Sequence, residues 1–107
     1  MVAPKLFELY MVCLQLGDCA DDRPCIVISP PVGGRVTVAP ISAALDLYNP
    51  ANHFRIESDL VEFESSGLDR TSYVLGNELR EIDCADLDVH LGELTGSQLK
   101  KFVDWIG

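Results

Sequence analysis

An arginine and a serine at the ends of two apolar segments carry the clearest chemical pattern in this sequence. Arg-Pro-Cys-Ile-Val-Ile-Ser occupies residues 23–29, and Val-Thr-Val-Ala-Pro-Ile-Ser occupies residues 36–42. If the two segments pair as strands, the guanidinium of Arg23 and the hydroxyl of Ser42 lie on neighbouring strands. A fixed cation beside a hydroxyl suits chemistry at a phosphate, because both groups bind its charged oxygens. The alternative is an arginine in a turn and a serine that ends a strand, without a chemical role.

The cysteines and histidines do not form a metal-binding pattern. Cysteines stand at positions 13, 19, 25 and 84, and the first three are six residues apart. This spacing matches none of the common zinc-ligand spacings, so we expect no metal and no cofactor. Cys25 lies within an apolar run and is expected to pack as a small hydrophobic residue. His53 and His90 are expected in loops or at the surface rather than as a general acid or base.

Length and composition indicate one folded domain over residues 1–107. The chain has 107 residues, of which 48% are hydrophobic and 23% are charged. These values suit a globular domain with a substantial core. No apolar run reaches the roughly 20 residues that span a bilayer, and residues 1–5 lack the basic stretch and apolar core of a signal peptide. We therefore expect a cytoplasmic protein without membrane contact, whose cysteines stay reduced.

The net charge of −9 arises from 17 acidic and 8 basic residues. A chain with this charge repels nucleic acid at long range. Any contact with phosphate must therefore be local and made by a few arginines. The alternative is that the acidic residues serve only solubility.

Short apolar and alternating runs predict a mainly β protein, built as a small barrel or sandwich. Gly33-Gly34 supplies the positive φ that a tight hairpin turn between two of the runs requires. We expect about five to seven antiparallel strands. The expected strands cover residues 6–14, 25–28, 35–39, 53–56, 60–64, 71–75 and 78–82.

The C-terminal segment changes to a helical period. Thr95-Gly96-Ser97-Gln98 has the form of a capping box, which predicts a helix over about residues 96–106. Residues 83–87 are expected to form a helical turn with Asp83 as its cap. The expected apolar stripe of the C-terminal helix, flanked by Trp105, consists of Leu99, Phe102, Val103 and Ile106.

The order of these segments resembles that of the MazF/PemK toxins. The resemblance implies an SH3-like antiparallel barrel of the CcdB/PemK type with a short C-terminal helix, acting as a homodimer. It also implies metal-independent cleavage of single-stranded RNA and neutralisation by a cognate antitoxin. The resemblance covers about residues 9–107. Besides residues 23–29 and 38–42, it rests on Gly-Leu-Asp-Arg-Thr-Ser-Tyr-Val-Leu at 67–75, Leu-Arg-Glu-Ile-Asp at 79–83 and Leu-Gly-Glu-Leu at 91–94.

The resemblance also implies roles for four residues. Arg23 matches the arginine of the family's Arg-Pro motif, which stabilises the pentacovalent phosphorane or takes part in proton transfer. Ser42 matches a position usually held by threonine, whose hydroxyl holds or polarises the scissile phosphate. Arg70 and Ser72 match positions in the strand after the glycine turn, and we expect them to bind RNA. These roles suit RNA, which supplies its own 2′-hydroxyl nucleophile, so that the enzyme only orients the attack and neutralises charge.

Two other functions stay open, because the chain departs from the family pattern. The family's Gly-Asp opening is absent, and the loop before Arg23 carries Asp18, Asp21 and Asp22 where relatives often have basic or polar residues. One alternative is a catalytically degenerate member that only binds a partner. The other is a CcdB-like toxin that acts on a protein such as DNA gyrase, which an acidic surface would suit.

Overall fold

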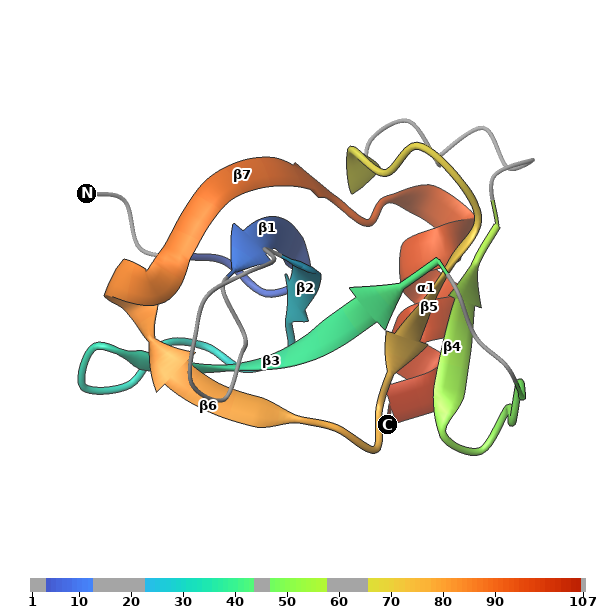
Figure 1. Cartoon of the computed structure of the whole chain (residues 1–107), viewed down its shortest axis with the longest axis horizontal. Coiled ribbons are helices and arrows are strands. Elements are labelled where there is room, and N and C mark those ends of the chain that lie inside the picture. The colour runs from blue at the N-terminus through green and yellow to red at the C-terminus, as the bar shows by residue number, and fades with distance from the viewer. Residues whose placement is uncertain (1–3, 13–22, 44–46, 58–65, 107) are drawn as a thin grey trace.

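The structure is a computed structural model of the chain. It describes residues 4–12, 23–43, 47–57 and 66–106. This part forms seven strands, one 3-10 turn and one α-helix (Figure 1), and all pairings between its strands are antiparallel. The predicted strand at 60–64 lies outside the described residues. The elements are β1 (Glu8–Val12), β2 (Arg23–Val27), β3 (Arg35–Ser42), β4 (His53–Ile56), β5 (Ser72–Leu75), β6 (Arg80–Asp83), the 3-10 turn Cys84–Asp86, β7 (Leu87–Glu93) and α1 (Gly96–Ile106).

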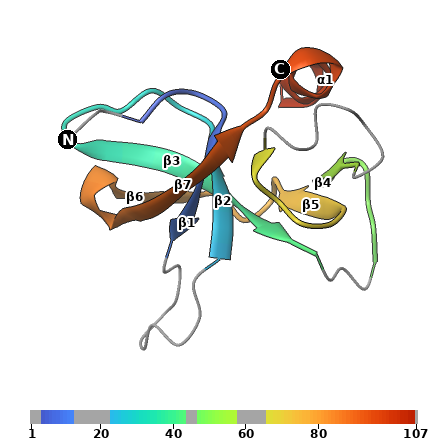
Figure 2. The ribbon, with the colours of Figure 1, turned by 90° about the horizontal axis from the view of Figure 1, so that it is seen from above.

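Strand β3 organises the sheet. The strand order is β4-β5-β3-β2-β1-β7, and β6 also pairs with β3. Residues 35–38 of β3 pair with β6, whereas residues 41–42 pair with β5. Strand β3 therefore runs from β1, β2, β6 and β7 on one side to β4, β5 and α1 on the other (Figure 2). The predicted mainly β fold with a C-terminal helix is confirmed, although the described strands leave the barrel open between β4 and β7.

The hairpin that joins β2 to β3 follows directly from its glycines. Gly33 and Gly34 have φ values of +59° and +77°. Val32 and Arg35, which flank them, exchange two backbone hydrogen bonds of 2.8 and 3.0 Å. Two central residues with positive φ define the turn that matches the twist of paired strands. The predicted role of Gly33-Gly34 is confirmed, and the turn sets the register that places Ser42.

Two hydrophobic clusters lie on opposite faces of β2. Ile26 belongs to the cluster that α1 covers, whereas Cys25 and Val27 belong to the second cluster. All three side chains are fully buried. A strand buried on both faces reads as a continuous apolar run, as residues 25–28 do. The first cluster contains Leu9, Ile26, Ala39, Ile41, Phe54, Ile56, Val74, Leu94 and Phe102, and the second contains Val12, Cys25, Val27, Val36 and Val38.

The C-terminal helix has the predicted bounds but a different buried face. Phe102 is fully buried and Leu99 is partly buried, whereas Val103 and Ile106 are 42% and 41% exposed. The predicted stripe was therefore wrong at these last two positions. The physical reason is Trp105, whose ring packs 5.7 Å from Phe54 and whose Nε1–H donates to the Pro50 carbonyl at 2.8 Å. This contact turns α1 so that Trp105 faces the sheet.

The segment before α1 contains a strand that the sequence did not predict. The helical turn is present as the 3-10 turn Cys84–Asp86, but the Asp83 side chain makes no capping hydrogen bond to it. Its carboxylate accepts from Arg35 instead. Strand β7 then pairs with β1, with irregular register at two places. Val89 on β7 is 55% exposed, and this exposure weakens the local signal for a strand.

Candidate functional site

Arg23 and Ser42 lie at the same end of two hydrogen-bonded strands. Strands β2 and β3 pair with Cys25 opposite Pro40. Arg23 stands two residues before Cys25, and Ser42 stands two residues after Pro40, so the continued register brings the two residues together. Because side chains alternate along a strand, both lie on the face that Cys25 occupies. Arg23 is exposed and Ser42 is half-buried, so the predicted cation and hydroxyl share one surface.

Arg80 projects from the same face of the sheet, four residues along β3 from Ser42, and no role was predicted for it. It stands opposite Val38 on β3, and Val38 packs in the same cluster as Cys25. Burial raises the pKa of the Cys25 thiol to about 12, although the positive charges of Arg23 and Arg80 both act to lower it. Two guanidiniums therefore flank a neutral, buried thiol. A signal was available in the sequence, because Arg80 shares a strand face with Ile82, where an apolar residue is expected.

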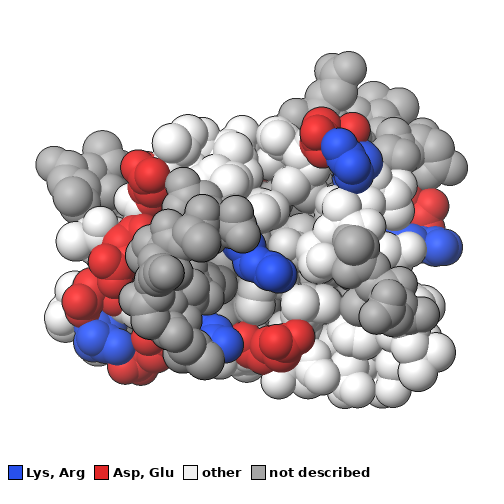
Figure 3. Space-filling model, in the orientation of Figure 1, with Lys and Arg blue, Asp and Glu red and all other residues white. Residues whose placement is uncertain are grey.

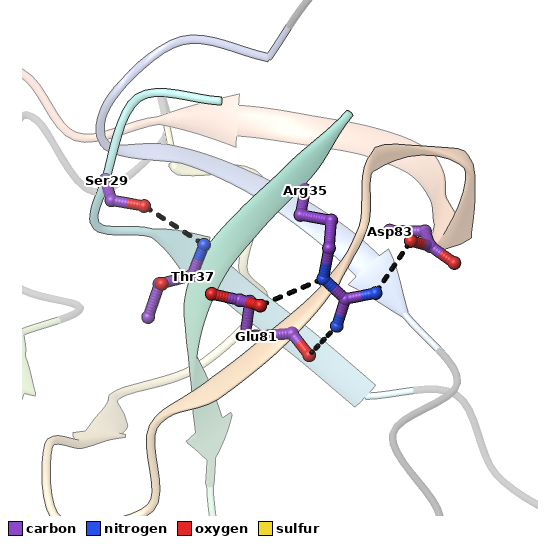
Figure 4. A network of polar contacts seen from close by, with 5 residues as sticks. All are labelled: Ser29, Arg35, Thr37, Glu81 and Asp83. Atoms are coloured by element: carbon purple, nitrogen blue, oxygen red, sulfur yellow. Dashed lines mark hydrogen bonds and ion pairs between the residues drawn. The ribbon is translucent and has the colours of Figure 1, made fainter. Parts of the chain in front are cut away.

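A network around Arg35 joins β3 to β6, the strand that carries Arg80. The Arg35 Nε and Nη1 groups pair with Glu81 Oε1 and Asp83 Oδ1, both at 2.9 Å, and Nη2 donates to the Glu81 carbonyl at 3.1 Å (Figure 4). On the other side of β3, the Thr37 N–H donates to Ser29 Oγ at 3.0 Å. Exposed ion pairs contribute little free energy, but these contacts all form in the observed register, in which Arg35 stands opposite Asp83.

Arg70 and Ser72 do not converge on the Arg23 and Ser42 surface in the predicted way. Ser72 is 4% exposed, and its hydroxyl donates to the Arg70 carbonyl at 2.9 Å. The next residue, Tyr73, stands opposite Ser42, so Ser72 points to the other face of the sheet. Arg70 is exposed and pairs with its neighbour Asp69 at 3.2 Å, which lowers the pKa of that carboxyl. The chain thus uses Ser72 to hold the backbone at Arg70.

The two histidines have local partners. His53 Nδ1 accepts from the Asn49 N–H at 3.0 Å. His90 Nε2 lies 2.9 Å from a carboxylate oxygen of Glu8, on the side of the sheet where β1 and β7 pair. Both histidines are partly or largely exposed, as predicted. Neither contact involves Arg23 or Ser42.

Glu8 is the centre of a small polar cluster on β1. Its side chain is only 15% exposed. Burial acts to raise the pKa of Glu8, but hydrogen bonds from the Lys5 backbone N–H and the Tyr10 hydroxyl, together with His90, lower it below its ordinary value. Burial and the bond to Glu8 raise the pKa of Tyr10 to about 12. The cluster therefore keeps Glu8 ionised and Tyr10 protonated.

Charge is unevenly spread on the face that Figure 3 draws. The red atoms visible there gather mainly on the side of β6 and β7, whereas separate blue groups are spread across the whole face. Among the described residues, no group of three or more His, Cys, Asp or Glu side chains has an arrangement that could hold a metal ion. No helix in the described part of the chain is long and apolar enough to cross a membrane.

The whole fold matches those of known toxins. A toxin from Mycobacterium tuberculosis, MazF-mt6, is 24% identical with a TM-score of 0.66, over 94% of this chain and 92% of that one. A mycobacterial endoribonuclease is 17% identical with a TM-score of 0.71, over 99% and 89%. Another, solved in complex with its cognate antitoxin, is 18% identical with a TM-score of 0.69, over 99% and 91%. At these identities the likeness shows the fold alone.

Sequence comparison supplies the family. No curated protein sequence matches the chain. A family profile described as "PemK-like, MazF-like toxin of type II toxin-antitoxin system" matches residues 5–106, which is nearly the whole chain and includes every strand described above. The resemblance first seen at residues 23–29 and 38–42 is confirmed, and the chain belongs to the PemK-like, MazF-like toxins of type II toxin–antitoxin systems.

Proposed function

We propose that this chain is an endoribonuclease that cleaves single-stranded RNA without a metal or cofactor. The observation that carries the proposal is that Arg23 and Ser42 lie at the same end of β2 and β3, and that Arg80 projects from the same face of the sheet, opposite Val38. Two guanidiniums and a hydroxyl on one face of a sheet are donors of the kind that stabilises charge developing on a phosphate. The solved endoribonucleases with the same fold support the assignment.

In the proposed reaction the RNA supplies the nucleophile. The 2′-oxygen forms a bond to the adjacent phosphorus, the bond from phosphorus to the 5′-oxygen breaks, and the products are a 2′,3′-cyclic phosphate and a 5′-hydroxyl. The 2′-hydroxyl gives its proton to solvent, and the leaving oxygen takes one up. The Arg23 guanidinium forks onto the phosphorane oxygens, which lysine cannot do. Ser42 donates a hydrogen bond to the phosphate, and Arg80 adds a second positive charge.

Arg70 and Ser72 have supporting roles in this proposal. The exposed guanidinium of Arg70 contacts the RNA backbone after exchanging its weak pairing with Asp69 for a phosphate. Ser72 is buried and does not contact the RNA. It positions Arg70, because its hydroxyl donates a hydrogen bond to the Arg70 carbonyl. We further propose that the active form is a cytoplasmic homodimer and that a cognate antitoxin neutralises it. The structure of an endoribonuclease with the same fold in complex with its cognate antitoxin supports the second proposal.

The test is cleavage of a long single-stranded RNA by the purified chain, with and without a chelator. We expect fragments that end in a 2′,3′-cyclic phosphate in both conditions. Arg23→Ala should reduce the rate by about 100-fold or more, the usual loss for a transition-state donor, and Arg23→Lys should stay impaired. Lys100→Ala is the matched control, since it removes a positive charge from an exposed position of α1. A wild-type protein that cleaves no RNA would overturn the proposal and favour a protein target.

A further inference from the structure

We propose that Tyr48, supported by Tyr73 and Arg55, stacks against one base of the single-stranded RNA and so holds the strand beside the cleavage site. The inference rests on the proposed function, because it names a binding site for the same substrate. It is carried by strand register, ring geometry and charge, none of which involves Arg23.

The first observation is a row of side chains across three strands. Ser42 on β3 stands opposite Tyr73 on β5, and Tyr73 stands opposite Arg55 on β4. Residues directly opposite in paired strands project to the same face, with neighbouring strands about 4.8 Å apart. Arg55 therefore lies about 10 Å across the sheet from Ser42. The surface that carries the Ser42 hydroxyl continues without interruption to Tyr73 and Arg55.

The second observation is the position of Tyr48 on this row. Its ring centroid lies 5.6 Å from that of Tyr73 and 6.3 Å from that of His53. The Arg55 Cζ atom lies 5.9 Å from the Tyr48 centroid. These contacts hold the ring in place, yet Tyr48 remains 44% exposed. A large ring that is fixed by its neighbours and still accessible is suited to receive a planar partner at low entropic cost.

The third observation is a hollow beside Tyr48 whose charges balance. Its volume is about 460 Å³, and it lies between residues 48–57 and α1, which packs near β4 (Figure 1). Arg55 pairs with Glu57 at 2.8 Å, and the helix contributes Lys101 and Asp104 to the lining. Two positive and two negative groups favour an uncharged planar ligand over a phosphate. A nucleobase fits this requirement, whereas its own phosphate belongs with Arg23 and Ser42.

The experiment measures RNA binding separately from cleavage. The probe is a mixed-sequence single-stranded RNA in which 2′-O-methyl groups block the nucleophile, so that only binding is observed. Tyr48→Leu keeps apolar area but removes the ring. It should raise the Kd by roughly 5- to 100-fold, which corresponds to the free energy of one base–aromatic stack. Tyr48→Phe keeps the ring and should bind as the wild type does. Leu47→Ala is the matched control, because Leu47 is the exposed neighbour of Tyr48.

Cleavage kinetics provide a second measurement. If Tyr48 only holds the strand, Tyr48→Leu should raise KM and leave kcat nearly unchanged. Equal binding by wild type and Tyr48→Leu, with wild type active, would overturn the inference and leave the proposed function intact. A defect of Tyr48→Leu in antitoxin binding alone would overturn it in favour of a peptide contact. A wild type that neither binds nor cleaves RNA would remove the proposed function and this inference together.

Discussion

Ser42 on β3 and Tyr73 on β5 stand directly opposite each other, on the same two-residue pairing that joins the two parts of the sheet. Before this pair, β3 lies between β2 and β6, which carry Arg23 and Arg80. After it, β5 leads to β4 and the aromatic surface. The hydroxyl that we assign to phosphate therefore stands at the junction between the charged part of the surface and its aromatic part.

Replacement of Ser42 tests the role of its hydroxyl. Ser42→Ala should lower the single-turnover cleavage rate about fivefold, since a hydrogen bond from a neutral hydroxyl contributes roughly 1 kcal/mol. Ser42→Thr keeps the hydroxyl and should retain most of the activity. Ser29→Ala removes a hydroxyl from the same hairpin, where it accepts only from Thr37 among the described contacts, and should affect stability rather than rate. An unchanged rate in Ser42→Ala would exclude the assigned role.

Arg80 is the strongest addition that the structure makes to the site. Arg80→Ala should slow cleavage by about 10- to 100-fold, because it removes one of two charges that face the phosphate. Lys100→Ala, which removes an exposed positive charge from α1, should leave the rate unchanged. A rate of Arg80→Ala equal to that of Lys100→Ala would contradict the role assigned to Arg80.

Local sequence signals predicted the elements that depend on few residues. Gly33-Gly34 predicted its hairpin, and Thr95-Gly96-Ser97-Gln98 predicted the start of α1, because both signals act within a turn or two of chain. The strand pairing that places Arg23 beside Ser42 followed from the same hairpin. The strand pattern alone predicted a small barrel or a sandwich. The resemblance to a family then predicted which overall fold the chain adopts.

Contacts between distant segments explain what the sequence did not predict. Arg80 reaches the site because β6 pairs with β3, more than 40 positions earlier in the chain, and no local pattern encodes that pairing. The sequence did not predict the burial of Gln98, which is 1% exposed and whose Nε2 has no hydrogen-bond partner among the described residues. Ser72 was expected on the RNA surface, but alternation along β5 turns it inward beside Tyr73.

The approach of Gly76 to Trp105 predicts a strong effect of a single methyl group. A Cβ on Gly76 would collide with the Trp105 ring and lie 3.1 Å from the Asn52 carbonyl oxygen. Gly76→Ala should therefore destabilise the fold by about 1–3 kcal/mol, the usual cost of overpacking. Urea unfolding followed by the fluorescence of Trp105, the single tryptophan of the chain, measures the change.

A substitution at Gly33 distinguishes the effect of limited space, which acts at Gly76, from the effect of backbone conformation. Gly33 has a φ of +59°, but no atom lies within 4 Å of a Cβ built there. Gly33→Asn should cost little, because asparagine tolerates this left-handed region in hairpin turns. An unchanged free energy of unfolding in Gly76→Ala would contradict the packing of α1 against the end of β5.

The Glu8 cluster predicts how stability depends on pH. Because the folded-state pKa of Glu8 lies below its ordinary value of 4.5, its ionised form stabilises the fold above about pH 4.5, and this contribution is lost as the pH falls through the folded-state pKa. Glu8→Gln should lower the free energy of unfolding by about 1–2 kcal/mol at pH 7, since the nearly buried carboxylate accepts charge-assisted or multiple hydrogen bonds. The difference from wild type should shrink as the pH falls through the folded-state pKa of Glu8, because the carboxyl then becomes neutral. Glu78→Gln, which changes an exposed carboxylate in the turn before β6, should leave the pH profile unchanged. A Glu8→Gln deficit that stays constant from neutral to acidic pH would show that the side chain acts through its shape and not its charge.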